Sequence, residues 1–574
     1  MTGRRRVLVA AALLAVSGLN PGLAQAGTAG SASTALIDYT VLLDDGAARD
    51  TVAHDAALAA IRTAGGTVLR ENPATGVVVV AGPHADFAER VSAAPGVLGA
   101  ARSHAINRLP GGQGHDEEAT PSGPAVTRPR PAEVAATGRA GMDPLDARLW
   151  GLRMVRSDLA RERQPGDRRV LVGVLDSGID ATHPDLAPNV DRGLSRNFVV
   201  DIPYDENGTV IDGPCEFRGC VDPLNHDDYG HGTHVAGTTA AAANGFGVSG
   251  VAPKVTLVDI RVGQDSGYVF LQPVLDAITY GADIGLNVMD LTFAIDPWIY
   301  NCVDNPADTP EQQLQQRTTI IAMNRALDYA HRKGVTLVNE TGYTHDDLGR
   351  PHPDTLSPNY PPGAAYPRQI DNATCRAMPI EGNHVIGVSG LGPSGVKADY
   401  SNYGVEQVSL AAPGGFRADG LGTPWHMTRD NQILSTYSRV AATAKGWLTE
   451  AGEVTPLGET SGMLKHCQGT ACAFYRWAES TSRAAPHVSG TAALVISQYG
   501  DRRASRVTMA PDRVEYVLLS TAQPRPCPTP RLYSYAPIGR PPEYDAYCEG
   551  ATEFNGFYGH GIVDAFAAVT RGER

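Results

Sequence analysis

Between residues 37 and 107, apolar and polar positions follow a short, regular pattern. Brief apolar or alternating runs flank two stretches with helical spacing, Val52 to Ala64 and Ala85 to Ala93. The resulting order is strand, helix, strand, strand, helix, strand. This order predicts a small ferredoxin-like α+β domain. Within it the sequence has no cluster of catalytic residue types.

From about residue 143 onward, longer apolar runs alternate with helical stretches. The expected strands are Val170 to Leu175, Val255 to Val262, Val288 to Phe293 and Gly334 to Val338, and the expected helices are Leu271 to Gly281 and Thr318 to Lys333. Such alternation predicts an α/β domain with a doubly wound, mostly parallel sheet. Functional groups are then expected at the carboxyl ends of strands, and Asp176 directly follows one of them.

The two remaining N-terminal segments have the composition of processed or exposed chain. Arg4-Arg5-Arg6, the apolar run Val7 to Leu19 and the small residues Ala24-Gln25-Ala26 predict a signal peptide over 1–26. The apolar run is shorter than the ~20 residues that span a bilayer. Residues 108–142 are rich in Pro, Gly, Ala and charge, which predicts a flexible linker with a processing site. We therefore expect a secreted, extracellular protein without a membrane anchor in its mature form.

Charge and cysteine content narrow the class further. The 574 residues carry a formal charge of −14, which argues against a nucleic-acid partner. Eight cysteines in an exported chain suggest disulfides rather than zinc, because paired CxxC units are missing from the sequence. Local pairing gives Cys215–Cys220, Cys467–Cys472 and Cys527–Cys548, and leaves Cys302–Cys375. Sequence alone does not fix this connectivity.

Three residue types that together perform acyl transfer occur in the order Asp, His, Ser. Asp176 precedes a Ser-Gly turn, His231 lies between two glycines, and Ser482 precedes Ala484-Ala-Pro as if opening a helix. A serine hydroxyl becomes a nucleophile when an oriented base accepts its proton. Alternatives are a turn aspartate, an N-cap serine and a metal site at the histidines, although the Glu of an H-E-x-x-H site is absent. We interpret His234, one turn further on, as a core histidine.

These three segments resemble the signatures of the subtilisin-like serine peptidases. The motifs are Asp176-Ser-Gly-Ile, His231-Gly-Thr-His-Val-Ala-Gly and Thr481-Ser-x-Ala-Ala-Pro-His-Val. Further matches are Gly250-Val-Ala-Pro253, Tyr400-Ser-Asn-Tyr-Gly404, Ala411-Ala-Pro-Gly-Gly415 and Tyr558-Gly-His-Gly-Ile-Val-Asp-Ala565. The similarity covers roughly residues 145–570, with insertions around 297–318, 345–380 and 416–479.

The resemblance implies a peptidase domain over 143–574 with the catalytic residues Asp176, His231 and Ser482. Residues 37–107 resemble the inhibitor-like propeptide of secreted members, which implies a zymogen whose own propeptide is an intramolecular inhibitor. No cofactor is implied. Calcium is common in the family and is a candidate structural ion, but the sequence has no compact ligand loop to hold it.

Several positions depart from the family pattern around the oxyanion. Tyr343 stands where the family has an asparagine donor, whose loss costs about 10²–10³ in kcat. Its hydroxyl could donate, or its ring could fill the oxyanion space. The remaining donor would be the Ser482 N–H, with Thr481. Ser480 replaces a glycine and adds strain if that glycine has positive φ, and Arg483 replaces an apolar residue and needs solvent or a partner.

The predicted substrate pocket also differs from the family. It is formed by two segments with the residues Thr292, Phe293, Ala294, Glu340, Thr341 and Gly342. Glu340 and Thr341 stand where the family has small alanines, and Asp290, before the first segment, stands where the family has an asparagine. The Glu340 carboxylate could favour a basic P1 residue or simply fill the pocket. The leading prediction is a secreted serine endopeptidase acting on peptides or proteins. The alternative is a catalytically impaired pseudopeptidase or binding protein on the same fold, and a metal hydrolase using His231 and Asp228 ranks behind both.

Overall fold

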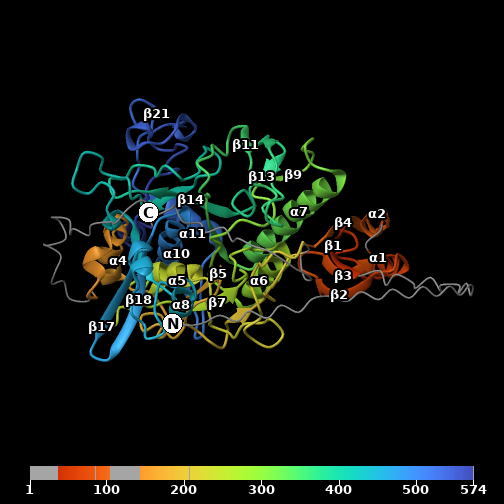
Figure 1. Ribbon diagram of the computed structural model, residues 1–574, viewed down its shortest axis with the longest axis horizontal. Coiled ribbons are helices and arrows are strands. Elements are labelled where there is room, and N and C mark those ends of the chain that lie inside the picture. Colours follow the sequence, from red (N-terminus) through yellow and green to blue (C-terminus); the bar gives the residue numbers. More distant parts are fainter. Residues whose placement is uncertain (1–35, 84–85, 104–142, 206, 573–574) are drawn as a thin grey trace, which may run out of the picture.

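The computed structural model describes residues 36–83, 86–103, 143–205 and 207–572, drawn in Figure 1. The predicted signal peptide, 1–26, and the predicted linker, 108–142, lie outside these residues. Two bodies are visible, a small domain at the N-terminal end of the described chain and a much larger α/β domain. Among the helices that the structure describes, none has both the length and the apolar character needed to cross a bilayer.

The small domain has the predicted order of elements. They are β1 (Leu36–Leu43), α1 (Thr51–Thr63), β2 (Thr67–Asn72), β3 (Val77–Pro83), α2 (Phe87–Ser92) and β4 (Val97–Arg102). The four strands form an antiparallel sheet in the order β2-β3-β1-β4. Its core joins Val41 and Val80 of the sheet to Ile61 of α1 and Phe87 of α2, all fully buried. The alternation in the sequence therefore gives a sheet covered by two helices.

The large domain is built on a seven-stranded parallel sheet in the order β15-β14-β10-β8-β5-β7-β6. Its strands are β5 (Leu171–Asp176), β6 (Arg196–Asn197), β7 (Thr256–Arg261), β8 (Val288–Asp290), β10 (Thr336–Glu340), β14 (Val385–Leu391) and β15 (Leu410–Pro413). This sheet confirms the predicted α/β, doubly wound class. β8 ends at Asp290, three residues before the predicted end at Phe293.

Helices cover both faces of this sheet because successive strand residues point to opposite sides. Val338 packs into the core that contains helices α5 (His231–Ala240) and α10 (Ala485–Tyr499). The preceding residue, Leu337, packs into the core beneath α6 (Leu271–Ile284) and α7 (Pro310–Arg332). The apolar runs of the sequence are thus strands buried on both faces.

The small domain packs on α6 and α7 of the large domain (Figure 1). The Asn72 amide donates to Asp276 at 2.9 Å and to Thr279 at 3.1 Å, both on α6. Arg325 of α7 donates to the carbonyls of Leu43 and Thr75 at 2.8 and 3.1 Å. Polar contacts from two helices therefore fix the position of the small sheet.

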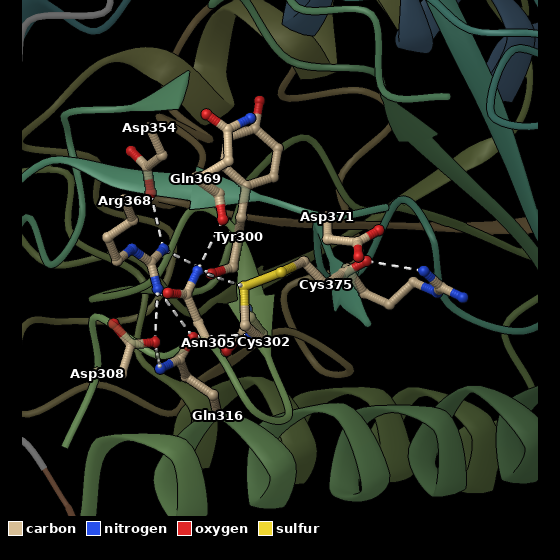
Figure 2. Close-up of a disulfide and its surroundings, with 12 residues drawn as sticks. Tyr300, Cys302, Asn305, Asp308, Gln316, Asp354, Arg368, Gln369, Asp371 and Cys375 are labelled. Carbon is tan, nitrogen blue, oxygen red and sulfur yellow. Dashed lines mark hydrogen bonds and ion pairs between the residues drawn. A yellow bond between two sulfur atoms is a disulfide. The ribbon is translucent and has the colours of Figure 1, made fainter. Parts of the chain in front are cut away.

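The first two insertions fold together into one unit, and Figure 2 shows the disulfide that joins them and its surroundings. The unit contains β9 (Asn301–Cys302) paired with β13 (Cys375–Arg376), and β11 (His352–Asp354) paired with β12 (Arg368–Ile370). The Cys302–Cys375 disulfide joins the two segments. Arg368 is fully buried and forms ion pairs with Asp308 at 3.0 Å and Asp354 at 2.7 Å. A covalent link and a buried ion network thus hold this unit.

The third insertion forms a three-stranded antiparallel sheet that extends from the large domain (Figure 1). It contains β16 (Ile433–Thr436), α8 (Arg439–Ala444), α9 (Pro456–Thr460), β17 (Met463–Gln468) and β18 (Ala471–Ala478). The Cys467–Cys472 disulfide closes its hairpin. With Cys215–Cys220 and Cys527–Cys548, all eight cysteines are in disulfides, in the pairs that local pairing favours.

Short elements complete the described chain. They are η1 (Asp146–Arg148), α3 (Trp150–Met154), α4 (Ser157–Arg163), η2 (Arg429–Asn431), η3 (Thr481–Arg483), β19 (Asp501–Arg502), β20 (Val507–Thr508), α11 (Pro511–Thr521), β21 (Leu532–Tyr533), η4 (Ala536–Ile538), η5 (Pro542–Tyr544), β22 (Ala546–Tyr547) and α12 (Ala565–Arg571). Most of them follow α10 at the C-terminal end of the chain.

Candidate active site

Asp176 and His231 form a tight pair at the carboxyl edge of the sheet. Asp176 is the last residue of β5, and His231 is the first residue of α5. His231 Nδ1 lies 2.9 and 2.8 Å from the two carboxylate oxygens of Asp176. An ionised carboxylate only accepts hydrogen bonds, so Nδ1 carries the hydrogen and Nε2 is the basic nitrogen.

The position of His231 depends on the glycine before it. Gly230 has φ +91°, and a Cβ there would lie 2.4 Å from the Tyr437 ring. A side chain at this position would collide with that ring and would be strained in the left-handed region. The small residue therefore lets α5 begin directly against the core, with the imidazole facing Asp176.

The Asp176 carboxylate is buried yet held in its charged form. It accepts hydrogen bonds from the Ser177 N–H at 2.7 Å and from the Thr292 hydroxyl at 3.0 Å. Burial alone would raise the pKa of Asp176, but the charge and hydrogen bond of His231, together with these two donors, hold it below its ordinary value. An ionised Asp176 is therefore available to stabilise a His231 cation.

Ser482 is fully buried in the short turn η3, three residues before α10 begins. Its hydroxyl donates to Glu340 Oε2 at 3.0 Å and lies 2.8 Å from the Ser480 hydroxyl. Its N–H, the expected oxyanion donor, donates to Ser480 Oγ at 3.0 Å. Both polar groups of the predicted nucleophile are therefore bonded to side chains that replace small residues of the family pattern.

Ser480 causes no backbone strain. Its φ is 177°, which is extended backbone that any residue adopts. The conditional expectation of strain at this position therefore does not hold. The consequence of the substitution lies in its hydroxyl, which caps the Ser482 N–H.

Glu340 lies at the end of β10 and contacts the turn that carries Ser482. Its side chain is 4% exposed, and Oε2 also accepts a hydrogen bond from the Thr481 hydroxyl at 2.5 Å. Sequence reasoning placed Glu340 in the substrate pocket but missed its contact with the nucleophile. Tyr343, at the predicted oxyanion position, is 37% exposed and lines a cavity that Glu340 also lines.

A cavity of about 160 Å³ opens beside these groups. Its lining includes Asp176, His231 and all the predicted pocket residues, namely Thr292, Phe293, Ala294, Glu340, Thr341 and Gly342. Ile299, Tyr300 and Leu356 from the inserted unit also line it, and sequence reasoning did not identify them. The insertions therefore contribute part of the wall of the cavity next to the Asp176–His231 pair.

Asp290 adds a third carboxyl to this region, at the end of β8. Burial raises its pKa to about 7, and the charges of Asp176 and Glu340 act in the same direction, opposed by His231. Asp290 stands where the family has an asparagine. A neutral carboxyl there would resemble that amide in both size and polarity.

Two other predicted positions are buried. His234 is fully buried, its Nε2 lies 3.1 Å from the Arg476 carbonyl, and burial lowers its pKa well below its ordinary value. This agrees with a core histidine rather than a base. Arg483 is 4% exposed, so its guanidinium is shielded from solvent. Its positive charge acts to lower the pKa of His234 and of Tyr400.

A parallel α/β sheet with an Asp–His pair at a strand end and a serine at a helix entrance is an arrangement of the Asp-His-Ser hydrolases. Comparison with protein families identifies the family of Asp-His-Ser hydrolases to which the chain belongs. The Subtilase family matches residues 167–561, about two thirds of the chain, so the chain belongs to the subtilase family. The prediction of a serine-type endopeptidase agrees with this membership.

Individual relatives support the same family. Subtilisin DY of Bacillus licheniformis is 24% identical over 358 residues, 62% of this chain and 88% of its own length. Thermitase of Thermoactinomyces vulgaris is 29% identical over 244 residues, 42% of this chain and 62% of its own. Fervidolysin of Fervidobacterium pennivorans is 27% identical over 245 residues, 40% of this chain and 29% of its own length. The chain thus spans less than two thirds of thermitase and of fervidolysin.

Solved structures establish the fold over nearly the whole chain. The crystal structure of EpiP, an epidermin leader peptide processing serine protease from Staphylococcus aureus, matches with a TM-score of 0.57 at 19% identity. The match covers 94% of this chain and 99% of EpiP. Fervidolysin gives a TM-score of 0.53 at 20% identity, over 95% of this chain and 62% of its own.

Proposed function

We propose that the chain is a secreted serine endopeptidase, made as a zymogen, in which Ser482, His231 and Asp176 form the catalytic triad. The observation that carries this proposal is the pair of bonds from His231 Nδ1 to Asp176, at 2.8 and 2.9 Å. They fix the tautomer in which Nε2 is the base.

The proposed reaction assigns one role to each of these residues. Ser482 Oγ attacks the peptide carbonyl carbon while its proton passes to His231 Nε2, and Asp176 stabilises the resulting imidazolium. His231 then returns the proton to the leaving amine as the C–N bond breaks, and water releases the acyl group by the same route. In this structure the Ser482 hydroxyl donates to Glu340. Proton transfer to His231 therefore requires that hydroxyl to turn first.

The cavity supports a peptide substrate rather than a small ion. It is bordered by β10 and the segment after β8, and it includes Phe293, Met378 and Ile380 as apolar walls. Apolar walls with a few convergent polar groups suit a side chain of an extended peptide. The Glu340 carboxylate is directed to Thr481 and Ser482, which supports an apolar P1 residue over a basic one.

The zymogen part of the proposal rests on the position of the small domain. Its last described residue, Ser103, lines a second cavity together with Asp296. Asp296 also lines the cavity beside the catalytic pair. Asp296 thus borders both the cavity lined by the end of the small domain and the cavity beside Asp176 and His231, which supports an inhibitory position of the small domain.

Calcium does not fit the acidic group found in the described part of the chain. The carboxylates of Asp201, Asp222 and Asp265 lie within 4.8 Å of one another. Arg261, fully buried, forms ion pairs with all three, at 2.6 Å to Asp222 and 3.8 Å to Asp201. An internal guanidinium thus supplies the cation, and we propose no metal at this position.

Labelling by a fluorophosphonate tests the proposal. The full chain, a Ser482→Ala variant and a Ser489→Ala variant are incubated with the probe, and labelled protein and released small domain are measured by mass spectrometry. Ser489 is another fully buried serine, on α10, and serves as the matched control. We expect labelling and release in the wild type and in Ser489→Ala, and neither in Ser482→Ala. A folded wild type that takes no label at any pH would refute the endopeptidase.

A further inference from the structure

The contact between Glu340 and the nucleophile suggests a role for this carboxyl in the reaction. Glu340 Oε2 lies 3.0 Å from Ser482 Oγ and 2.5 Å from Thr481 Oγ1. Glu340 stands in the pocket segment, at a position where the family has an alanine. It lies three residues before Tyr343, which replaces the family's amide donor. A carboxyl has thus been gained within a few residues of the position where a donor has been lost.

The hydrogen bonds around Ser482 describe a blocked nucleophile. Its hydroxyl has one hydrogen, and that hydrogen is given to Glu340. The Ser480 hydroxyl accepts the Ser482 N–H and lies 2.8 Å from Ser482 Oγ. While Glu340 accepts the hydroxyl hydrogen, His231 cannot take it.

We propose that Glu340 is a catalytic residue that switches the enzyme by its own protonation. As a carboxylate it holds the Ser482 hydroxyl, and as a neutral acid it releases Ser482 and donates a hydrogen bond to the oxyanion in place of the missing amide. This inference rests on the proposed endopeptidase activity and names the residue that sets its pH range.

The step is balanced without any further reactant. The Ser482 Oγ–carbon bond forms, the serine proton moves to His231 Nε2, and the carbonyl π electrons move to the oxygen. The Glu340 O–H donates to that oxygen and keeps its own proton. When the oxyanion collapses and the C–N bond breaks, the amine takes the proton from His231. A neutral carboxylic acid in an apolar site is an effective oxyanion donor, whereas a carboxylate there would repel the developing charge.

Glu340 interacts electrostatically with titratable groups of neighbouring elements. The charge of Glu340, at the end of β10, raises the pKa of Asp290 on β8. Asp176 of β5 also raises the pKa of Asp290, and His231 of α5 lowers it. Arg483 of η3 and Glu340 both act on Tyr400, in the loop after β14. Buried carboxyls of two neighbouring strands and the cation of Arg483 therefore belong to the same electrostatic environment as Glu340.

Substitution of Glu340 separates the two parts of the proposal. Glu340→Gln keeps a donor of the same size but carries no charge, and Glu340→Ala restores the family residue and removes the donor. Asp290→Asn is the matched control, because it neutralises a buried carboxyl in the same group of charges without touching Ser482. Each full-length variant is assayed for kcat and KM across pH with a fluorogenic peptide, normalised to the fluorophosphonate-titrated serine, and its fold is checked by thermal unfolding.

The wild type should lose activity as pH rises through the titration of Glu340, by tenfold per pH unit on that limb. Glu340→Gln should lack this alkaline limb, and Asp290→Asn should retain it. Glu340→Ala should also lack it, with a plateau kcat about 10²–10³-fold below that of Glu340→Gln and a similar KM. An alkaline limb that persists in Glu340→Gln, or equal plateaus for Gln and Ala, would overturn the inference while leaving the endopeptidase intact. Failure of the wild type to take the probe at any pH would instead reject the endopeptidase itself.

Discussion

At the scale of single residues, the candidate site differs from a simple triad because of the side chains around Ser482. Asp176 and His231 have the geometry of an orienting acid and a base, with both carboxylate oxygens within 2.9 Å of Nδ1. Ser482, in contrast, is bonded through its N–H to Ser480 and through its hydroxyl to Glu340. The proposed base is therefore oriented for proton transfer, whereas the proposed nucleophile requires rearrangement.

Removal of the Ser480 hydroxyl should increase turnover. The Ser482 N–H donates to Ser480 Oγ at 3.0 Å, so it is not free to receive an oxyanion. In Ser480→Ala and Ser480→Gly the N–H becomes available, and one oxyanion donor is worth about 10²–10³ in kcat. We expect kcat to rise by up to that factor with little change in KM, measured on a peptide substrate at the optimal pH.

Ser480→Thr serves as the control for this prediction, since it keeps the hydroxyl and should keep the low kcat. Because φ at position 480 is 177°, alanine and glycine should give equal gains. A gain restricted to glycine would show that backbone freedom, rather than the hydroxyl, limits the reaction.

The sequence singled out Asp176, His231 and Ser482 as a candidate triad, but it did not predict the contacts of Ser482. Asp176, His231 and Ser482 lie in local motifs whose neighbouring glycines and small residues are readable from the chain. The Glu340–Ser482 contact joins residues 142 positions apart and depends on the side-chain rotamer at the end of β10. Local patterns carry no information on such a contact, so Glu340 could be assigned to the pocket but not to the nucleophile.

At the scale of elements, the insertions form structure of their own that borders the cavity. Predicted helix 318–333 begins eight residues earlier, at Pro310, because Thr309 and Gln312 form a capping box. Both capping residues are visible in the sequence, although they lie in a segment that differs from the family pattern. The ion pairs of Arg368 could not be predicted from the sequence, because Asp308 and Asp354 come from two different insertions.

Loss of the Arg368 cation should destabilise the inserted unit. In Arg368→Met, the carboxylates of Asp308 and Asp354 would remain buried without their guanidinium, which costs about 3–5 kcal/mol. Arg368 also donates to the Tyr300 carbonyl at 2.8 Å, and Tyr300 lines the cavity. We expect a lower free energy of unfolding, measured with denaturant in a Ser482→Ala background, and a higher KM in the active enzyme.

Arg350→Met is the matched control in the same insertion. Arg350 is 54% exposed and pairs with Glu549, so its loss should cost less than about 1 kcal/mol. Equal destabilisation by the two substitutions would contradict a structural role of the buried network.

At the scale of the whole molecule, the small domain and the peptidase domain meet through α6 and α7, on the side of the sheet opposite α5 and α10. Asp176 and His231 lie at the carboxyl edge of the sheet, so the small domain contacts a surface different from the candidate site itself. An inhibitory role therefore depends on firm docking of the small domain on these helices. The strength of docking can be tested separately from catalysis.

Arg325 of α7 should be a main contributor to this docking. Its guanidinium donates to the Leu43 and Thr75 carbonyls at 2.8 and 3.1 Å and pairs with Asp45 at 2.6 Å. Arg325→Ala leaves these acceptors without their charged donor, which should weaken docking by about 1–3 kcal/mol. In a full-length Ser482→Ala background, we expect faster hydrogen exchange in β1 and β3. In the active chain, we expect earlier release of the small domain and an earlier rise of peptidase activity.

Arg332→Ala, at the end of the same helix, is the control, because the described residues show no hydrogen bond or ion pair from Arg332 to the small domain. If exchange and release in Arg325→Ala match those of Arg332→Ala, docking does not depend on this guanidinium, and the contacts of Asn72 with α6 must hold the domain.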